Sequence, residues 1–175
     1  MTHLDAGALF RAHAPFVAGF LLRLGVGRRE LDDAVQEVFL TAHRRGGFYP
    51  GAAQPTTWLA EIALRVASGL RRTRRRRPEA DAALDEPAGG PTPFENAVAA
   101  EALDRLQRAL DTLGLEHRAV FILYEIEGEP CESIAAGLGV PVGTVYSRLH
   151  TARRAFRSAC AEMEQDAPRH RVEVA

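Results

Sequence analysis

The residues between 144 and 157 have side chains suited to binding a charged polymer. Four of them can hydrogen-bond to the edges of bases: Tyr146, Ser147, His150 and Thr151. Four arginines can pair with phosphates: Arg148, Arg153, Arg154 and Arg157. No acidic residue occurs between residues 141 and 157. Polar groups that read bases, flanked by cations that hold the backbone, are typical of a surface that contacts a nucleic-acid duplex.

A second basic cluster lies at residues 71–77, where six of seven residues are arginine: Arg71, Arg72, Arg74, Arg75, Arg76 and Arg77. Such a run binds phosphates without sequence preference. The alternative is a solvated end of a helix, where cations complement the C-terminal dipole. Six arginines exceed what that dipole needs, so the run favours a second contact with nucleic acid.

The net charge of −1 over 175 residues hides this pattern. Seven acidic residues and no basic ones lie between residues 78 and 104, so the acidic and basic blocks cancel in the sum. A duplex responds to the local patch rather than to the sum. Charge alone therefore does not exclude a nucleic-acid partner.

No segment predicts catalysis, a cofactor or membrane insertion. The sequence lacks a nucleophile elbow, a P-loop, zincin spacing and paired catalytic carboxylates. Cys131 and Cys160 form no metal-binding or disulfide pattern and are expected to be inert thiols. No apolar run approaches the ~18 residues that span a bilayer, and the N-terminus lacks a secretory-signal layout. We expect a soluble, cytoplasmic protein that is not an enzyme.

Apolar residues at three- and four-residue spacing predict an all-α fold. The first half reads as three helices, over residues 4–24, 30–44 and 57–76. The second half reads as four, over residues 94–113, 115–127, 131–138 and 142–162. Residues 78–93 are rich in proline, glycine and acid and predict a flexible linker. The sequence therefore predicts two small helical domains, at residues 1–77 and 94–163, followed by a tail at 164–175.

Residues 131–153 have the layout of a helix-turn-helix. Gly139 predicts the turn, Ala135 offers a small side chain where the two helices cross, and Val145 and Leu149 anchor the second helix. That arrangement directs the polar face of the second helix into a major groove. The alternative, an amphipathic surface helix in a bundle, requires neither the Gly-Val-Pro corner nor the unmixed positive charge.

Three stretches in this order resemble the extracytoplasmic-function (ECF) group of bacterial RNA polymerase sigma factors. "LDTLGLEHRAVFILYEIEGEPCESIAAGLGVPVGTVYSRLHTARRAFR" (110–157) resembles the region that binds the promoter −35 element. "ELDDAVQEVFLTAHRR" (30–45) is similar to the polymerase-binding helix of that group, and "TTWLAEIALRVASGLRRTRRRR" (56–77) to its −10-binding helix. The resemblance covers roughly residues 8–158.

The resemblance implies three binding surfaces and no covalent chemistry. Contact with core RNA polymerase would come from Asp32, Asp33, Gln36 and Glu37. Contact with the −10 element would come from Phe48, Tyr49, Arg65, Arg71, Arg72, Arg74 and Arg75. Contact with the −35 element would come from Thr144, Tyr146, Ser147, Arg148, His150, Thr151, Arg153 and Arg154. Simpler roles exist as well: Asp32 and Asp33 could complement a helix dipole, and Phe48 and Trp58 could be core residues.

The sequence departs from this group at two places. The group commonly has asparagine and aspartate, four residues apart, where this chain has Arg65 and Gly69. A serine–aromatic start is also usual where this chain reads "EPCESIA". The first departure bears on −10 preference, whereas Pro130 still suits a helix start in the second.

Two further expectations come from the same resemblance. The acidic linker would pass through the cationic active-site cleft of the polymerase, and an anti-sigma factor is a possible partner. The competing hypothesis is a helix-turn-helix transcriptional regulator that acts without stable polymerase association. That hypothesis explains residues 115–157 but gives the 30–45 face and the arginine-ended third helix no role.

Overall fold

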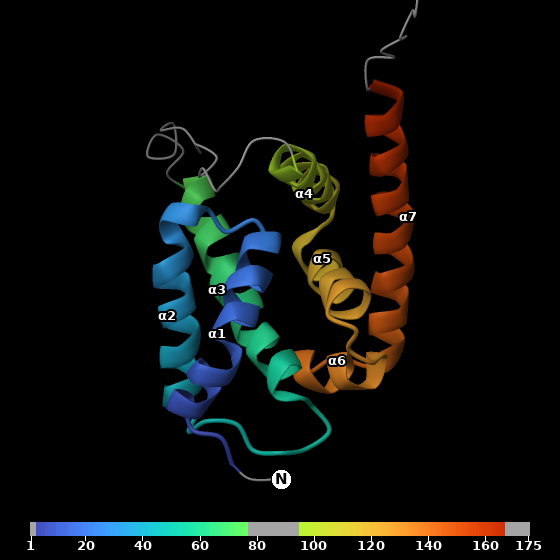
Figure 1. The fold of residues 1–175 in the computed structure, drawn as a ribbon. Coiled ribbons are helices and arrows are strands. Elements are labelled where there is room, and N and C mark those ends of the chain that lie inside the picture. Colours follow the sequence, from blue (N-terminus) through green and yellow to red (C-terminus); the bar gives the residue numbers. More distant parts are fainter. Residues whose placement is uncertain (1–2, 77–94, 167–175) are drawn as a thin grey trace, which may run out of the picture.

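The computed structural model describes residues 3–76 and 95–166, and this part of the chain is helical throughout (Figure 1). The helices of the first half are α1 (Ala6–Arg23), α2 (Arg28–Arg44) and α3 (Pro55–Arg76). Those of the second half are α4 (Glu95–Asp111), α5 (Leu115–Phe121), α6 (Cys131–Leu138) and α7 (Val142–Asp166). A π-helical turn, η2 (Ile122–Ile126), continues α5.

All seven expected helices are present. The helix expected over residues 115–127 ends in the π-helical turn, and the last helix runs four residues further than expected, to Asp166. The only extended pairing in the described residues is an isolated bridge between Leu4 and Phe48. The expected linker at 78–93 lies outside the described residues.

Local signals explain two helix boundaries that position the functional surfaces. Asp5 caps α1 by accepting a hydrogen bond from the backbone N–H of Ala8 at 2.7 Å, and this bond lowers the pKa of the Asp5 carboxyl. At the end of α6, Gly139 adopts a left-handed conformation with φ of 67°. Only glycine enters this region without steric cost, so the chain turns sharply there into α7.

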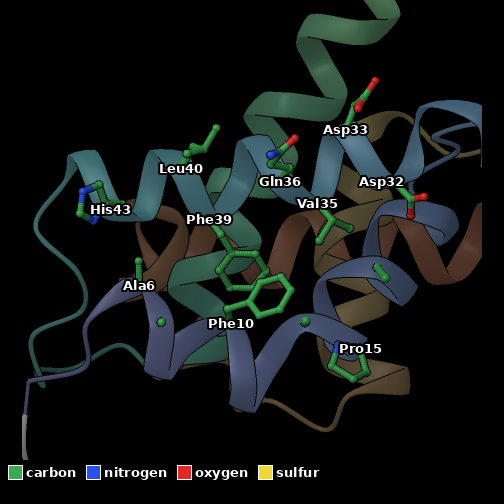
Figure 2. A pocket seen from close by; sticks show the side chains of 13 residues that line it. Ala6, Phe10, Pro15, Asp32, Asp33, Val35, Gln36, Phe39, Leu40 and His43 are labelled. Atoms are coloured by element: carbon green, nitrogen blue, oxygen red, sulfur yellow. The ribbon is translucent and has the colours of Figure 1, made fainter.

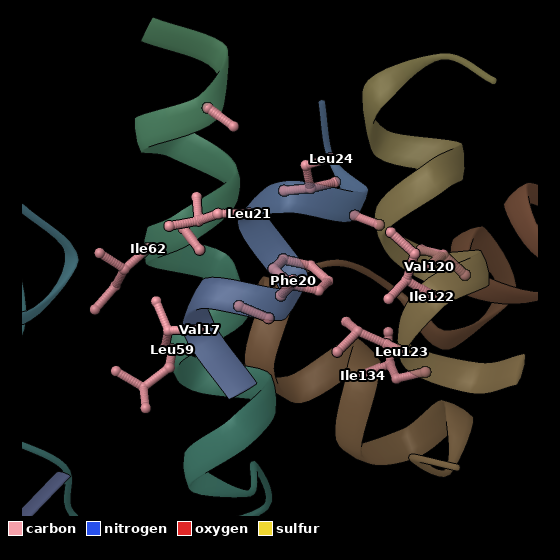
Figure 3. Close-up of a cluster of buried hydrophobic side chains, with 14 of the residues drawn as sticks. Val17, Phe20, Leu21, Leu24, Leu59, Ile62, Val120, Ile122, Leu123 and Ile134 are labelled. Carbon is pink, nitrogen blue, oxygen red and sulfur yellow. The ribbon is translucent and has the colours of Figure 1, made fainter. Parts of the chain in front are cut away.

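Helices α1, α2 and α3 pack side by side as a three-helix unit, and α5, α6 and α7 form a second one (Figure 1). The buried apolar side chains of the two units belong to one continuous cluster. Figure 3 shows Phe20 on the side of α1 that faces Ile122 and Leu123. All three of these side chains are fully buried. The described part of the chain is therefore a closed arrangement, in which the second half packs on α1 and α3 of the first.

Candidate nucleic-acid and partner-binding surfaces

The helix-turn-helix is present at the expected residues. Val145 and Leu149 are 0% and 3% exposed and anchor α7 against α6, while Ala135 is buried where the two helices meet. This packing turns the opposite face of α7 to solvent. Tyr146 is 52% exposed, and Ser147, His150 and Thr151 are exposed beside it. The four candidate base-reading side chains therefore share one accessible face, as predicted.

Two of the polar groups on this face have partners within the protein. The Tyr146 hydroxyl donates a hydrogen bond to Glu132 at 3.3 Å, and the negative charge of Glu132 raises the pKa of Tyr146. The hydroxyl of Ser147 donates to the backbone oxygen of Thr144 at 3.0 Å. Thr144 itself is half-buried. A base that binds Ser147 would have to compete with a bond inside the helix, whereas His150 projects freely.

The flanking arginines are paired with carboxylates from earlier in the chain. Arg148 pairs with Glu116 and Arg153 with Glu125, the latter at 2.5 Å. The Arg153 guanidinium also lies 5.1 Å from the centre of the Tyr124 ring. Its bond to Glu125 raises the pKa of Arg153. Arg154 is exposed. Exposed ion pairs stabilise a protein by about 0–1 kcal/mol, so phosphates can replace these carboxylates at small cost.

Sequence reasoning missed these pairs. Glu116 and Glu125 lie 32 and 28 residues before their partners, on α5 and η2. Nothing in the local charge pattern around Arg148 or Arg153 indicates an acidic neighbour, because no acid occurs between residues 141 and 157. Only the packing of α5 and η2 against α7 brings the charges together.

The loop before α3 divides its two candidate aromatic residues. Phe48 is only 4% exposed, and its ring centre lies 5.7 Å from that of Trp58, inside the core. The structure thus places Phe48 among packed side chains and not on a surface that could receive a base. Tyr49 is 68% exposed, and its ring lies 4.4 Å from the His3 ring. Tyr49 therefore remains the aromatic candidate for −10 contact.

The candidate arginines of α3 differ in how far they are free. Arg65 is 75% exposed at its side chain and pairs with Glu61 one turn earlier. Arg74 pairs with Glu30 on α2, and Arg71 is half-buried. Arg72 and Arg75 are exposed. The basic end of α3 therefore presents a mixed surface, on which Arg65, Arg72 and Arg75 are the most accessible candidates.

Asp33 and Gln36 on α2 form an exposed polar face together with the apolar Leu40, which is 43% exposed (Figure 2). Asp32 is exposed as well, nearer to α1. Glu37 has a different environment: it accepts hydrogen bonds from Arg44 at 2.9 Å and Thr41 at 3.3 Å. Three of the four candidate polymerase-binding residues thus share an open surface, while Glu37 is engaged within α2.

A groove of about 870 Å³ separates α1 from α2 directly beside this face (Figure 2). Its walls are mainly apolar and include Phe10, which is 50% exposed and meets Phe39 edge to face at 5.0 Å. Asp32, Asp33 and Gln36 also line it. An apolar groove with carboxylates beside it suits a partner helix that carries both apolar and basic side chains. Sequence reasoning found the polar residues but not the groove, which needs the packed pair of helices.

Within the described ranges, no cluster of histidine, cysteine, aspartate and glutamate could hold a metal ion. Cys131 is buried, which raises the pKa of its thiol, and Cys160 is half-buried. The described part of the chain also contains no helix with the length and hydropathy needed to cross a bilayer.

Comparison with known proteins matches each half to a different family model. Residues 9–77 match the model described as "Sigma-70 region 2", and residues 103–156 match "Sigma-70, region 4". The chain is 34% identical over 159 residues to the ECF RNA polymerase sigma factor SigL of Mycobacterium tuberculosis, covering 89% of each protein. The chain belongs to the ECF family of RNA polymerase sigma factors.

Other relatives of this sigma factor agree. It is 30% identical over 165 residues to RNA polymerase sigma factor CarQ of Myxococcus xanthus, covering 92% of each chain. It is 34% identical over 159 residues to the ECF sigma factor SigE of Mycolicibacterium smegmatis, covering 88% of this chain but spanning only 61% of the length of SigE.

Two solved structures share its fold. One is CnrH in complex with the cytosolic domain of CnrY, with a TM-score of 0.64 and 25% identity over 93% of this chain and 89% of that one. The other is the sigma factor RpoE in complex with the anti-sigma factor NepR from Bartonella quintana. Its TM-score is also 0.64, at 22% identity, over 86% of this chain and 92% of that one.

Proposed function

We propose that this sigma factor binds core RNA polymerase and directs it to promoters through two DNA-binding surfaces, without catalysing a reaction itself. The observation that carries the proposal is the match of two sigma-70 regions, in order, to the two helical halves. On this proposal residues 1–77 form the domain that binds polymerase and the −10 element. Residues 94–163 form the domain that binds the −35 element, and residues 78–93 form the acidic linker between them.

Polymerase docking is assigned to the face of Asp32, Asp33 and Gln36 together with the groove beside it. The carboxylates would pair with basic side chains of the partner, and the walls of the groove would bury its apolar ones. Glu37 would act indirectly, since it is bonded to Arg44 and Thr41. This assignment is supported by the exposure of the three polar side chains and of Phe10 and Leu40 around one concave surface.

For the −10 element the exposed candidates are Tyr49, Arg65, Arg72 and Arg75. Melting a promoter requires at least one base to be held out of the stack, which costs a few kcal/mol. The open Tyr49 ring can stack on such a base, while the arginines hold phosphates. Arg71 and Arg74 would contribute charge from less accessible positions.

For the −35 element, α7 would lie in the major groove with Tyr146, Ser147, His150 and Thr151 toward base edges. Arg148, Arg153 and Arg154 would bind phosphates, the first two after release from Glu116 and Glu125. Thr144, at the start of the helix, would approach the backbone. We further propose that the protein works in the cytoplasm and that an anti-sigma factor restrains it.

Transcription in vitro with purified core polymerase and a promoter library tests the proposal. We expect promoter-specific transcripts that depend on this chain. Asp32→Lys combined with Asp33→Lys should abolish them by preventing docking, because the carboxylates become repulsive to a basic partner. The matched control changes the same charge elsewhere: Glu162→Lys with Glu164→Lys, on the exposed end of α7, should transcribe like the unchanged protein.

The competing hypothesis, a helix-turn-helix regulator that acts without polymerase, gives the opposite result. In that case the folded chain would bind DNA, would not co-purify with core polymerase, and would give no transcript above the core-only level. The family membership of both halves disfavours this alternative.

A further inference from the structure

The two halves of the chain touch through a contact that we call the α3–α6 seam: Gln54, Thr56 and Thr57 against Glu129, Ser133 and Gly137. Thr57 is 0% and Ser133 5% exposed, and their hydroxyl oxygens lie 3.2 Å apart in a hydrogen bond. The backbone N–H of Gln54 donates to the Ser133 hydroxyl at 3.3 Å, and the Thr56 hydroxyl donates to Glu129. Buried polar groups of both halves therefore satisfy one another across the seam.

Gly137 brings the backbones of the two helices close together. A Cβ atom at this position would lie 2.5 Å from the Thr57 Cβ and 2.6 Å from the Thr57 carbonyl carbon. Contacts below 3.0 Å with backbone cannot be relieved by a side-chain rotation. The closed arrangement thus depends on the absence of a side chain at Gly137, which is itself inside a helix with no strained backbone angle.

A second contact closes the other end of the molecule, where α1 ends. The Arg23 guanidinium pairs with Glu127 at 3.1 Å. The Arg23 carbonyl oxygen accepts long hydrogen bonds of 3.5 Å from Gln107 and from the buried Arg118. Between this contact and the seam lies the apolar layer in which Phe20 faces Ile122 and Leu123 (Figure 3). The halves are therefore held at two places about a shared core.

Closure brings the two candidate DNA surfaces to one place. Arg65, a −10 candidate, and Arg148, a −35 candidate, line the same groove of about 490 Å³ between α3, α5 and α7. The −10 and −35 elements are centred roughly 25 base pairs apart, about 85 Å of B-DNA at ~3.4 Å per base pair. Two side chains that line one small groove are separated by only a small fraction of that length.

We propose that this closed arrangement is a resting state and that promoter recognition requires the α3–α6 seam to open. Most candidate DNA-binding side chains stay exposed on closure, so the closed chain can touch one promoter element at a time. Its geometry forbids both at once, and two linked binding modules lose their joint affinity when they cannot bind simultaneously. Closure itself follows from the contacts alone, whereas its effect on transcription rests on the proposed function.

Small-angle X-ray scattering of the full chain tests closure without reference to function. A compact chain of 175 residues has a radius of gyration of about 16 Å, and we expect the unchanged protein to lie near this value. Gly137→Leu should raise it and give a pair-distance distribution with two maxima, as for two separated bodies. In the matched control, Gly143→Leu, the new side chain starts from a position with no neighbouring atom within 4 Å, so the radius should not change.

An extended wild-type chain, or an unchanged radius in a Gly137→Leu protein that is helical by circular dichroism, overturns the proposal. A disulfide provides the converse test and does not depend on the wedge. In a Cys131→Ala, Cys160→Ser background, Thr57→Cys with Ser133→Cys places two thiols where the hydroxyls lie 3.2 Å apart. Oxidation should then lock the seam.

The oxidised lock should reduce promoter-specific transcription by core polymerase at least tenfold, and dithiothreitol should restore it. The background protein without the new pair should be indifferent to oxidation. Equal transcription by the locked and reduced forms contradicts the proposal. If the reduced protein is also silent with core polymerase, the sigma-factor function fails instead, and the scattering result still decides whether the chain is closed.

Discussion

Arg118 offers the sharpest test of how the closed structure is held together. Its side chain is 2% exposed, although it carries a charge. Nη1 donates to Asp111 at 2.7 Å and Nη2 to the backbone oxygen of Leu113 at 3.4 Å. Burial lowers the pKa of Arg118, and the neighbouring negative charge of Asp111 opposes this effect. The guanidinium is therefore tolerated inside the protein mainly because Asp111 accompanies it.

This arrangement predicts that losing Asp111 costs more than losing the charge on Arg118. Arg118→Met keeps most of the packed stem and removes hydrogen bonds from a charged donor, each worth about 1.5–3 kcal/mol. Asp111 is 54% exposed and regains water, so we expect a net loss of only about 1 kcal/mol. Asp111→Ala leaves the guanidinium buried without its partner. Breaking a fully buried pair costs about 3–5 kcal/mol, and the exposed side of Asp111 reduces this to roughly 2 kcal/mol.

Urea unfolding followed by circular dichroism measures both values, since the shared core should make the halves unfold together. With a slope of about 2 kcal/mol per molar urea, the midpoint should fall by roughly 0.5 M for Arg118→Met and roughly 1 M for Asp111→Ala. The double variant should resemble Arg118→Met, because no buried charge remains to be orphaned. The reasoning is refuted if Asp111→Ala is the milder change, or if the two effects simply add.

Three further predictions concern DNA binding and pH. Ser147→Ala and His150→Ala should each relax −35 preference by about 1–3 kcal/mol per lost base contact, seen as reduced discrimination in competition binding to mutated promoters. Arg153→Ala should weaken binding to all sequences and reduce the salt slope by about one, whereas Glu125→Gln should strengthen it by freeing Arg153; equal salt slopes would contradict a phosphate contact. Burial lowers the pKa of His13, so its unfolded form binds protons first. Stability should therefore fall as pH drops through about 6.5, less so in His13→Gln, which chemical denaturation between pH 7.5 and 5.5 measures.

The sequence predicts the helices well because each depends on local information. Three-and-four spacing of apolar residues indicates the buried faces, and Gly139 indicates the turn into α7 without any knowledge of the partner helix. The exposed face of Tyr146 and His150 follows from the same period once Val145 and Leu149 are taken as buried. What the helical period determines, sequence analysis recovers.

Features that depend on packing between distant segments were out of its reach. The groove needs α1 and α2 in contact, with Phe10 left half open beside Phe39. Phe48 looked equally suited to a flexible loop or to the core. It lies in the core because Leu4 and Phe48 exchange backbone hydrogen bonds of 2.9 and 2.8 Å, which hold the loop against the start of the chain. Its contact with Trp58 completes that packing.

The composition of the seam fits a contact that is made and released. Thr57 and Ser133 are small and polar, so separating them exposes hydroxyls that water can satisfy. Phe20, Ile122 and Leu123 differ, because burying each such side chain contributes about 1.5–3 kcal/mol that separation would forfeit. Complete opening is therefore expensive for the free chain. A partner supplies this energy only if it binds the open form more tightly than the closed one. The polymerase-docking face lies on α2, which takes no part in the seam, so docking there alone favours neither form. The preference for the open form must come from contacts that both halves make at once.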